Sequence, residues 1–366
     1  MKSTSPATSP ATNPAASPAT NLAASPAASP AGSLAGSRTV GHRATMRAIT
    51  QSRYGCAEVL QLSEVPVPEP GDGQVLIKVR AAGLDRGTEH LMTGKPYAVR
   101  LAMGLRRPKN PVPGRDVAGI VVSVGAGVPR FIPGEEVYGV APGAFAEYAV
   151  ANQDKLAHKP ADVSFAQAAV VPISASTAFQ ALTHAGKVQA GQSVLITGAS
   201  GGVGSYAVQL AVTLGAEVTA VCSTAGVDYV TAIGAHHIID RTTENWWEGS
   251  HRYDLILDIA GNPPLRRLRR ALKPQGTVVF VGGEGSGAVT GMSRQLRGAL
   301  LSPFLRQRLV LLMARERGTD YEHLARLIED GQLDASLDRT YPLEDAARAM
   351  RQLADGTIRG KVALTV

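Results

Sequence analysis

The sequence of 366 residues contains little cysteine and no long apolar run. Its two cysteines, Cys56 and Cys222, are too few for a disulfide framework, and this favours a reducing compartment. No apolar stretch approaches the roughly twenty residues that a membrane-spanning helix requires. We therefore expect a soluble, cytoplasmic protein with no membrane partner, long enough for about two domains.

The sequence also lacks a strong charge imbalance. Lys and Arg number 37, Asp and Glu number 30, and the two signs are well mixed. Three of the seven net positive charges precede Met46, so the body carries +4, and no nucleic-acid partner is expected. The densest basic cluster stands beside leucines at helical spacing, which predicts a solvated helix face. Its members are Arg266, Arg267, Arg269 and Arg270.

Residues 1–45 have neither acidic nor aromatic side chains and consist mostly of Ala, Ser, Pro and Thr. Such a segment cannot bury enough apolar surface to offset its ordering entropy, so we expect it to be disordered. A targeting segment and a start-site artefact are the alternatives, because Met46 opens a convincing first strand.

A strand, a turn, a helix and a second strand are predicted within residues 193–223. Residues 194–196 have the length and composition of a buried parallel strand. Glycines and small residues follow at once, and apolar residues then recur at helical spacing as far as Leu214. A β-rich run at 217–221 begins after Gly215. This order is typical of the βαβ unit that holds a dinucleotide.

The glycines of the turn have separate expected tasks. Gly198 ends the first strand in a turn that a Cβ would strain, Gly201 lets the backbone approach a pyrophosphate, and Gly204 lets the helix pack against the sheet. The helix expected from Val203 presents unpaired N–H groups and partial positive charge to the phosphates. The predicted phosphate site comprises Gly198, Ala199, Ser200, Gly201, Gly202, Val203 and Gly204.

The rest of the chain predicts an α/β protein with two folded domains. Expected strands at 47–50, 59–62, 74–81, 117–124, 136–138 and 145–150 form a β domain over residues 46–166. Helices are expected at 167–171 and 177–185. Strands at 194–196, 217–221, 237–239, 255–259, 277–281 and 309–313 form a six-stranded, doubly wound Rossmann sheet within 167–316.

The end of the chain breaks this alternation. Helices at 322–329 and 343–353 and strands at 337–341 and 362–366 do not extend the βαβ rhythm. We therefore expect residues 317–366 to pack back on the first domain and complete it. We expect an apolar and basic insertion at 292–304 to cover a cleft between the two domains.

Six motifs follow one another along this body: residues 111–119, 133–139, 143–148, 198–211, 254–258 and 359–362. With them, the chain from Met46 to Val366 resembles the medium-chain dehydrogenase/reductase superfamily, and within it the zinc-independent quinone oxidoreductase group. The resemblance implies a GroES-like β domain, a Rossmann domain, a cleft between them, a nicotinamide cofactor and, commonly, a homodimer.

Zinc-dependent members of that superfamily hold the metal with a cysteine, a His-Glu pair and a further cysteine or acid. Here Arg115 and Asp116 stand at the His-Glu position, and Cys56 is the one cysteine of the β domain. Glu89 and His90 are neighbours without a third ligand. A zinc site requires three or four converging ligands, so we expect none.

The choice of cofactor depends on the end of the second strand of the βαβ unit, where an NAD site typically carries an acid for the ribose 2′-OH. In this sequence Ser223 and Thr224 follow the strand instead. Small hydroxyls tolerate a 2′-phosphate, and Arg241 after the third strand can supply the charge that binds it. We therefore predict NADPH in preference to NADH.

The resemblance also implies a lining for the nicotinamide end. Relatives carry Asn-Pro-x-Asp where this chain has Asp85-Arg86-Gly87-Thr88, so Asp85 replaces the asparagine and keeps at most one hydrogen bond to the carboxamide. Arg86 or Tyr97 is expected to donate to the substrate oxygen as negative charge develops. The alternative for each is a loop residue that faces water.

Three further residues complete the predicted cofactor site. Thr177 is expected at the head of the helix before the dinucleotide fold, where relatives have a threonine that reaches the cofactor; a helix cap or packed hydroxyl is the alternative. Gly282 and Gly283 end the fifth strand at the carboxyl edge of the sheet.

Neither a Ser/His/Asp nor a Cys/His nucleophile arrangement is present, and no acid–base pair has diagnostic spacing. This favours a reaction in which the cofactor carries the hard step and the protein orients it. The predicted function is NADPH-dependent hydride transfer to an activated double bond or quinone without a metal. A metal-free alcohol or aldehyde reductase and a non-catalytic NADP(H)-binding protein remain as alternatives.

Overall fold

Six short strands form the parallel sheet that the sequence predicts. The computed structural model describes residues 44–282 and 293–366, and in it the strand order is β10-β9-β8-β11-β12-β13. All five residues of the central strand β8 are buried, as expected where helices cover both faces. The strands are β8 (Ser193–Thr197), β9 (Glu217–Cys222), β10 (His237–Asp240), β11 (Tyr253–Asp258), β12 (Leu272–Phe280) and β13 (Arg308–Leu311).

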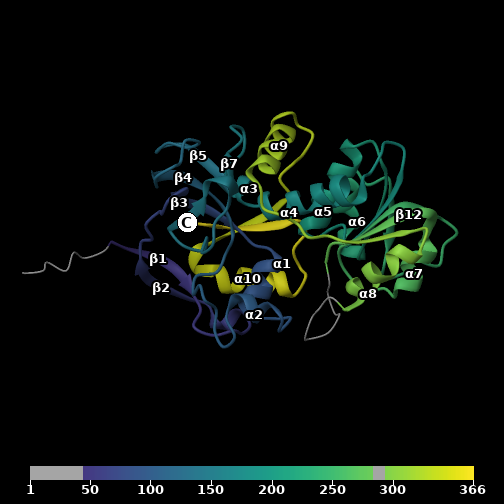
Figure 1. Cartoon of the computed structure of the whole chain (residues 1–366), viewed down its shortest axis with the longest axis horizontal. Coiled ribbons are helices and arrows are strands. Elements are labelled where there is room, and N and C mark those ends of the chain that lie inside the picture. Colours follow the sequence, from purple (N-terminus) through teal and green to yellow (C-terminus); the bar gives the residue numbers. More distant parts are fainter. Residues whose placement is uncertain (1–43, 283–292) are drawn as a thin grey trace, which may run out of the picture. The chain divides into compact units, whose positions relative to one another are not determined.

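The chain order reverses between β8 and β11, and this switch point is where open α/β sheets bind nucleotides. The helices of this half are α4 (Pro172–Gln180), α5 (Gly202–Thr213), α6 (Val227–Ala232), α7 (Leu265–Ala271) and α8 (Ser293–Leu301). Figure 1 shows α4 and α5 side by side, and their buried faces share one apolar core with β8, β9 and β11.

The first half of the chain forms a second sheet together with two strands from the end of the chain, β14 (Leu337–Pro342) and β15 (Lys361–Thr365). Its order is β14-β15-β3-β4-β5-β7, with β6 also paired to β3. Two further strands, β1 and β2, form a separate antiparallel ribbon. The strands are β1 (Thr45–Thr50), β2 (Gln61–Pro66), β3 (Gln74–Gly83), β4 (Asp116–Val124), β5 (Glu136–Val140), β6 (Tyr148–Asn152) and β7 (Leu156–His158). The helices α1 (Arg86–Thr93), α2 (Val99–Met103) and α3 (Phe165–Ala169) belong to the same half.

Some predicted bounds in this half are wrong. Residues 57–59 form a short helical turn, η1 (Ala57–Val59), and the strand begins at Gln61 because its register pairs Leu62 with Ile49. Phe145 precedes its strand, because its amide donates to the Pro113 carbonyl and its buried ring lies against Gly114. The structure also shows α1 and α2, which the sequence analysis did not predict. Disorder was predicted for residues 1–45; residues 1–43 lie outside the described residues, and the prediction is wrong at Thr45, which belongs to β1.

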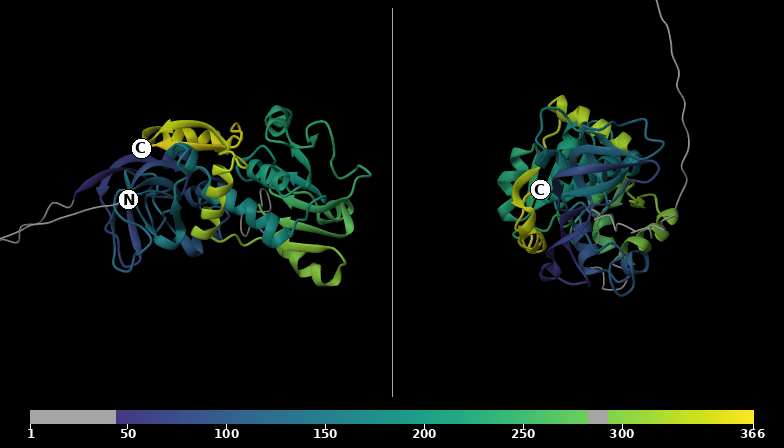
Figure 2. Two further views of the ribbon diagram at one scale, coloured as in Figure 1. Left: turned by 90° about the horizontal axis from the view of Figure 1, so that it is seen from above. Right: turned by 90° about the vertical axis from the view of Figure 1, so that its left-hand side faces the viewer.

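The end of the chain returns to the first sheet, as predicted. Strand β15 (Lys361–Thr365) pairs antiparallel with β3, and β14 (Leu337–Pro342) pairs parallel with β15. The yellow C-terminal strand can be followed beside β3 in Figure 1 and against the purple and teal strands in Figure 2. Two helices accompany them, α9 (Gly318–Glu329) and α10 (Ala346–Ala354). No helix in the two described ranges has both the length and the apolar content to cross a bilayer.

Candidate functional site

The turn after β8 has the conformation of a phosphate-binding loop. Gly198 has a φ of +66°, which an L side chain rarely adopts, and a Cβ there would lie 2.6 Å from the Ala260 Cβ. A Cβ on Gly201, the residue that caps α5, would meet only the Gly198 carbonyl, at 3.3 Å. The space in front of Gly201 is therefore open, and the first N–H groups of α5 lie behind it.

A glycine is required at position 204 for a reason other than the predicted packing of the helix on the sheet. A Cβ at this position would lie 2.1 Å from the Gly198 carbonyl oxygen, so the missing side chain lets α5 approach the turn rather than the sheet. The helix also begins at Gly202, one residue before the predicted start. The turn and the first turn of the helix thus form one tightly packed cradle.

The C-terminal segment holds this cradle in place. Gly360 donates its amide to the Ser200 carbonyl at 2.8 Å, and a Cβ on Gly202 would lie 2.9 Å from the Lys361 Cδ. The Lys361 Nζ is 3.1 Å from Asp116 Oδ2, and the two side chains are 2% and 0% exposed. Asp116 Oδ1 also accepts the Ile173 amide of α4 at 2.9 Å. One buried ion pair therefore connects β4, α4 and the phosphate turn.

Burial raises the pKa of Asp116 to about 6, and the nearby Lys361 ammonium opposes this rise. Sequence reasoning placed both residues in family motifs but gave them no joint role. The available signal was a lysine that directly precedes the apolar run at 362–364, where an unpaired charge is costly.

The ends of β9 and β10 form the expected ribose end of the site. The turn at 223–226 packs on the phosphate cradle, because a Cβ on Gly226 would lie 2.8 Å from the Ser200 Cβ. Thr224 donates its hydroxyl to Asp240 Oδ2 at 2.5 Å, and the Arg241 amide donates to the Cys222 carbonyl at 2.9 Å. The structure therefore places Ser223, Thr224 and the Arg241 backbone close together, and their role at the 2′ position stays a prediction.

Asp240 is the residue that sequence reasoning missed here. In an NAD site, an acid that binds the ribose 2′-OH is expected at the end of the second strand of the sheet. Asp240 instead ends the third strand and lies opposite Cys222 in the parallel register. Hydrogen bonds from Thr224 and then Thr242 lower the pKa of this carboxyl. A carboxylate therefore lies beside the hydroxyl that was expected to face a 2′-phosphate.

Thr177, Gly282 and Gly283 were also predicted to line the cofactor site, and the structure describes two of them. Thr177 lies in the middle of α4, not at its head, and its hydroxyl donates to the Ile173 carbonyl at 2.6 Å; the helix begins earlier because Pro172 suits a first helical position. Gly282 follows β12, and a Cβ there would lie 2.0 Å from the Ile259 carbonyl, so only glycine fits. Gly283 lies outside the described residues.

The insertion predicted at 292–304 provides α8 from residue 293 onward. Arg294 Nη2 is 2.6 Å from Asp258 Oδ2 at the end of β11, and Gln295 donates to the Gly282 carbonyl at 3.1 Å. Burial raises the pKa of Asp258 to about 6 despite this guanidinium. These contacts fix the first turn of α8 at the carboxyl edge of the sheet, while Leu300 and Phe304 are 74% and 85% exposed.

Asp85, Arg86 and Tyr97 come from two consecutive helical segments. Asp85 is 7% exposed and caps α1, with Oδ1 accepting the Thr88 amide at 2.7 Å. Arg86 forms an ion pair with Glu89 at 2.7 Å, so it is not a free loop residue. The ring of Tyr97, 46% exposed and just before α2, lies 4.8 Å from the Arg100 guanidinium. Of the two predicted donors, Arg86 and Tyr97, Tyr97 is the more exposed residue.

Comparisons with known proteins agree with this geometry. Residues 71–161 match the alcohol dehydrogenase GroES-like domain, and residues 233–364 match the zinc-binding dehydrogenase family. A chloroplastic quinone oxidoreductase, QR1, from Triphysaria versicolor is 34% identical over 338 residues, which are 87% of this chain and 97% of the relative. The chain belongs to the medium-chain dehydrogenase/reductase superfamily. Within it, the chain falls in the quinone oxidoreductase-like group, and the predicted Rossmann and GroES-like folds are confirmed.

Other relatives and solved structures are similar to this superfamily member over most of its length. A 2-methylene-furan-3-one reductase from Solanum lycopersicum is 32% identical, covering 87% of this chain and 79% of the relative. The solved quinone oxidoreductase of Coxiella burnetii has a TM-score of 0.78 at 28% identity, covering 88% of this chain and all of the other. A mycobacterial protein solved in complex with NADPH has a TM-score of 0.74 at 26% identity, with the same coverages. The chain is thus an oxidoreductase of the quinone and enone reductase type.

The family matched by residues 233–364 is described as zinc-binding, so the question is whether this chain has ligands for the metal. Within residues 44–282 and 293–366, no three His, Cys, Asp or Glu side chains are grouped as metal ligands. Arg115 forms an ion pair with Glu316, and the Asp116 carboxylate forms an ion pair with the Lys361 ammonium. The donor set at the expected position therefore does not fit a zinc ion.

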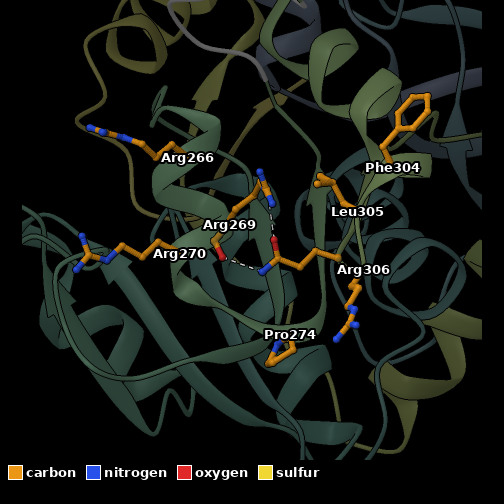
Figure 3. Close-up of a pocket in the computed structure, with 8 residues that line it drawn as sticks. Arg266, Arg269, Arg270, Pro274, Phe304, Leu305 and Arg306 are labelled. Atoms are coloured by element: carbon orange, nitrogen blue, oxygen red, sulfur yellow. Dashed lines mark hydrogen bonds between the residues drawn. The ribbon is translucent and has the colours of Figure 1, made fainter.

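A basic hollow of about 710 Å³ lies at the amino edge of the sheet, beside the starts of β12 and β13. Figure 3 shows the side chains of Arg266, Arg269, Arg270 and Arg306 pointing in different directions, and Arg269 is hydrogen-bonded to Gln307. Because these guanidinium groups do not converge, the hollow does not form an anion cradle. The geometry supports the predicted solvated helix face.

Proposed function

We propose that the chain reduces quinones or activated double bonds with hydride from NADPH and without a metal. The observation that carries the proposal is the open space in front of Gly201, the residue that caps α5. When bound there, the cofactor supplies a hydride from nicotinamide C4. The first N–H groups of α5 bind its pyrophosphate, and the contacts of Gly360 and Lys361 keep that turn in position.

The substrate oxygen gains negative charge as the hydride arrives, and a fixed donor stabilises it. We propose Tyr97 for this task, since its ring is held by the Arg100 guanidinium, and Arg100 is itself fixed to the Gly94 carbonyl at 3.0 Å. Arg86 is the second candidate and is oriented by Glu89. Asp85 supports Arg86 by capping the helix that carries it. Solvent supplies the proton.

The Tyr97→Phe variant should lower kcat with a quinone or an enone roughly tenfold, because one hydrogen bond to the developing charge is lost. Arg86→Ala should have a smaller effect, because Glu89 already engages its guanidinium. Steady-state kinetics with saturating NADPH measures both. If neither variant changed turnover, the assignment of these two donors would be wrong.

We propose that NADPH is preferred to NADH because Arg241 is exposed beside Thr224 and can reach a 2′-phosphate. A tenfold preference requires only about 1.4 kcal/mol, which one well-placed arginine supplies. The Arg241→Ala variant should therefore raise the Kd for NADPH about tenfold and leave that for NADH nearly unchanged. Titration of both cofactors checks this, and a wild-type preference for NADH would contradict it.

The enzymatic proposal is tested by incubating purified protein with NADPH and, separately, a quinone, an alkenal and a simple aldehyde. We expect oxidation of NADPH with the quinone or the alkenal, at a rate that a chelator does not change. Turnover of the aldehyde alone would favour an alcohol or aldehyde reductase. Binding of NADPH without any turnover would favour a non-catalytic protein.

We further propose a homodimer. Strand β13 is an edge of the six-stranded sheet, and large apolar side chains are exposed near it: Leu300, Phe304 and Met313. An open strand edge beside exposed apolar groups is a surface that a second copy can cover. Light scattering measures the mass of the assembly.

A further inference from the structure

A carboxylate lies at the ribose end of the cofactor site. Asp240 ends β10 in parallel register with Cys222, and the turn that follows Cys222 packs on Ser200 of the phosphate cradle. The carboxylate of Asp240 is hydrogen-bonded directly to Thr224, the residue after Ser223. It is therefore one side chain away from the position that a 2′-substituent of the cofactor is expected to occupy.

Hydrogen bonds hold this carboxylate in one place. Oδ2 accepts the Thr224 hydroxyl at 2.5 Å, while Oδ1 accepts the Thr242 amide at 2.9 Å and the Thr242 hydroxyl at 2.7 Å. Because three donors engage its two oxygens, the group cannot turn away from an arriving cofactor without losing them. A carboxylate offers about four acceptor positions, so one remains for a ribose hydroxyl. The same hydrogen bonds lower its pKa, which keeps it charged at neutral pH.

We propose that Asp240 is a specificity-determining residue, which opposes the preference for the 2′-phosphorylated cofactor that Arg241 provides. The inference rests on the proposed function of the site. A 2′-phosphate brings negative charge close to this carboxylate, whereas the 2′-hydroxyl of NADH can donate to it. At this half-buried position the repulsion changes affinity roughly three- to tenfold at low salt. The ratio of the two affinities is thus set by two adjacent residues of opposite charge.

The Asp240→Asn variant tests the proposal, because asparagine has the same shape, its oxygen still accepts from Thr242, and its amide group donates to the Thr224 hydroxyl. We expect the Kd for NADPH to fall roughly three- to tenfold and the Kd for NADH to stay constant or rise. Calorimetric titration of both cofactors at about 50 mM and about 500 mM salt measures this. The gain for NADPH should shrink at high salt, because screening weakens the charge effect and would not alter a structural one. Asp355→Asn is the matched control, since it removes the same charge from an exposed position on α10's C-terminal side.

Each outcome has a distinct meaning. A Kd ratio in Asp240→Asn equal to that of the wild type, or both Kd values changed by one common factor, would overturn the assignment of Asp240 and leave the proposed function intact. The same ratio change in Asp355→Asn would also overturn it, because net charge would then be the cause. A wild-type protein that binds neither cofactor would overturn the proposed function, and the role of Asp240 with it.

Discussion

The Gly201→Ala variant should bind NADPH about 100-fold more weakly than the wild type while its Tm changes little. A Cβ at this position faces open space in the cradle, with the Gly198 carbonyl at 3.3 Å as its nearest neighbour. The φ of Gly201 is −88°, which alanine adopts without strain. The methyl group therefore costs the fold little but occupies the space that the pyrophosphate requires. Calorimetry with NADPH and thermal unfolding measure the two quantities.

Two other glycines sharpen this test. Gly249→Ala is the matched control: its Cβ would find no atom closer than 4.0 Å, and it lies far along the chain from the turn, so neither Kd nor Tm should change. Gly204→Ala should weaken binding and lower Tm together, because its Cβ would lie 2.1 Å from the Gly198 carbonyl. An unchanged affinity in Gly201→Ala would show that the phosphates lie elsewhere.

The Rossmann half was predictable because its strands are buried on both faces and read as short apolar runs between glycines. Strand β8 and the glycine turn are local features, and a window of thirty residues is enough to recognise them. The return of β15 to β3 was also predictable, since the pattern at the end of the chain breaks the βαβ alternation. These elements are specified by residues that are neighbours in sequence.

The parts of the site that the sequence did not reveal depend on contacts between distant residues. Lys361 and Asp116 are 245 positions apart, and Thr224, in the turn after β9, is 16 positions from Asp240 at the end of β10. No local pattern shows that these pairs meet, although each pair decides what charge the site carries. Asp85 is a different case, because its contact is local: the residue that departs from the family motif caps α1 by accepting the Thr88 amide.

The Lys361→Met variant should lower the free energy of unfolding by about 3–5 kcal/mol near neutral pH, because it leaves the Asp116 carboxylate buried without its cation. Asp116 is fully buried, and its pKa is already raised to about 6 with the lysine present. Removing the ammonium raises that pKa further. Urea unfolding at about pH 5 and about pH 8 measures the loss. Arg351→Met, which removes an exposed ion pair with Glu58, is the control and should change stability little.

The pH dependence of this loss follows from the direction of the shift. A carboxyl whose folded pKa exceeds its unfolded value of 3.8 retains a proton in the folded state that the unfolded state releases. Its contribution to stability is therefore greatest at low pH and falls as the pH rises through the folded pKa. In the wild type this fall spans about pH 4 to 6, and in Lys361→Met it extends to higher pH. The difference between variant and wild type should consequently be smaller at pH 5 than at pH 8.

A double variant separates the buried charge from simple loss of packing. Asp116→Asn combined with Lys361→Met removes both charges, while asparagine still accepts the Ile173 amide. It should therefore recover most of the stability that the single variant loses. Because Lys361 also lies against Gly202, the double variant should retain its fold yet still bind NADPH less well than the wild type. A double variant as unstable as Lys361→Met would show that the methylene stem of the lysine, and not its charge, connects the phosphate turn to β4.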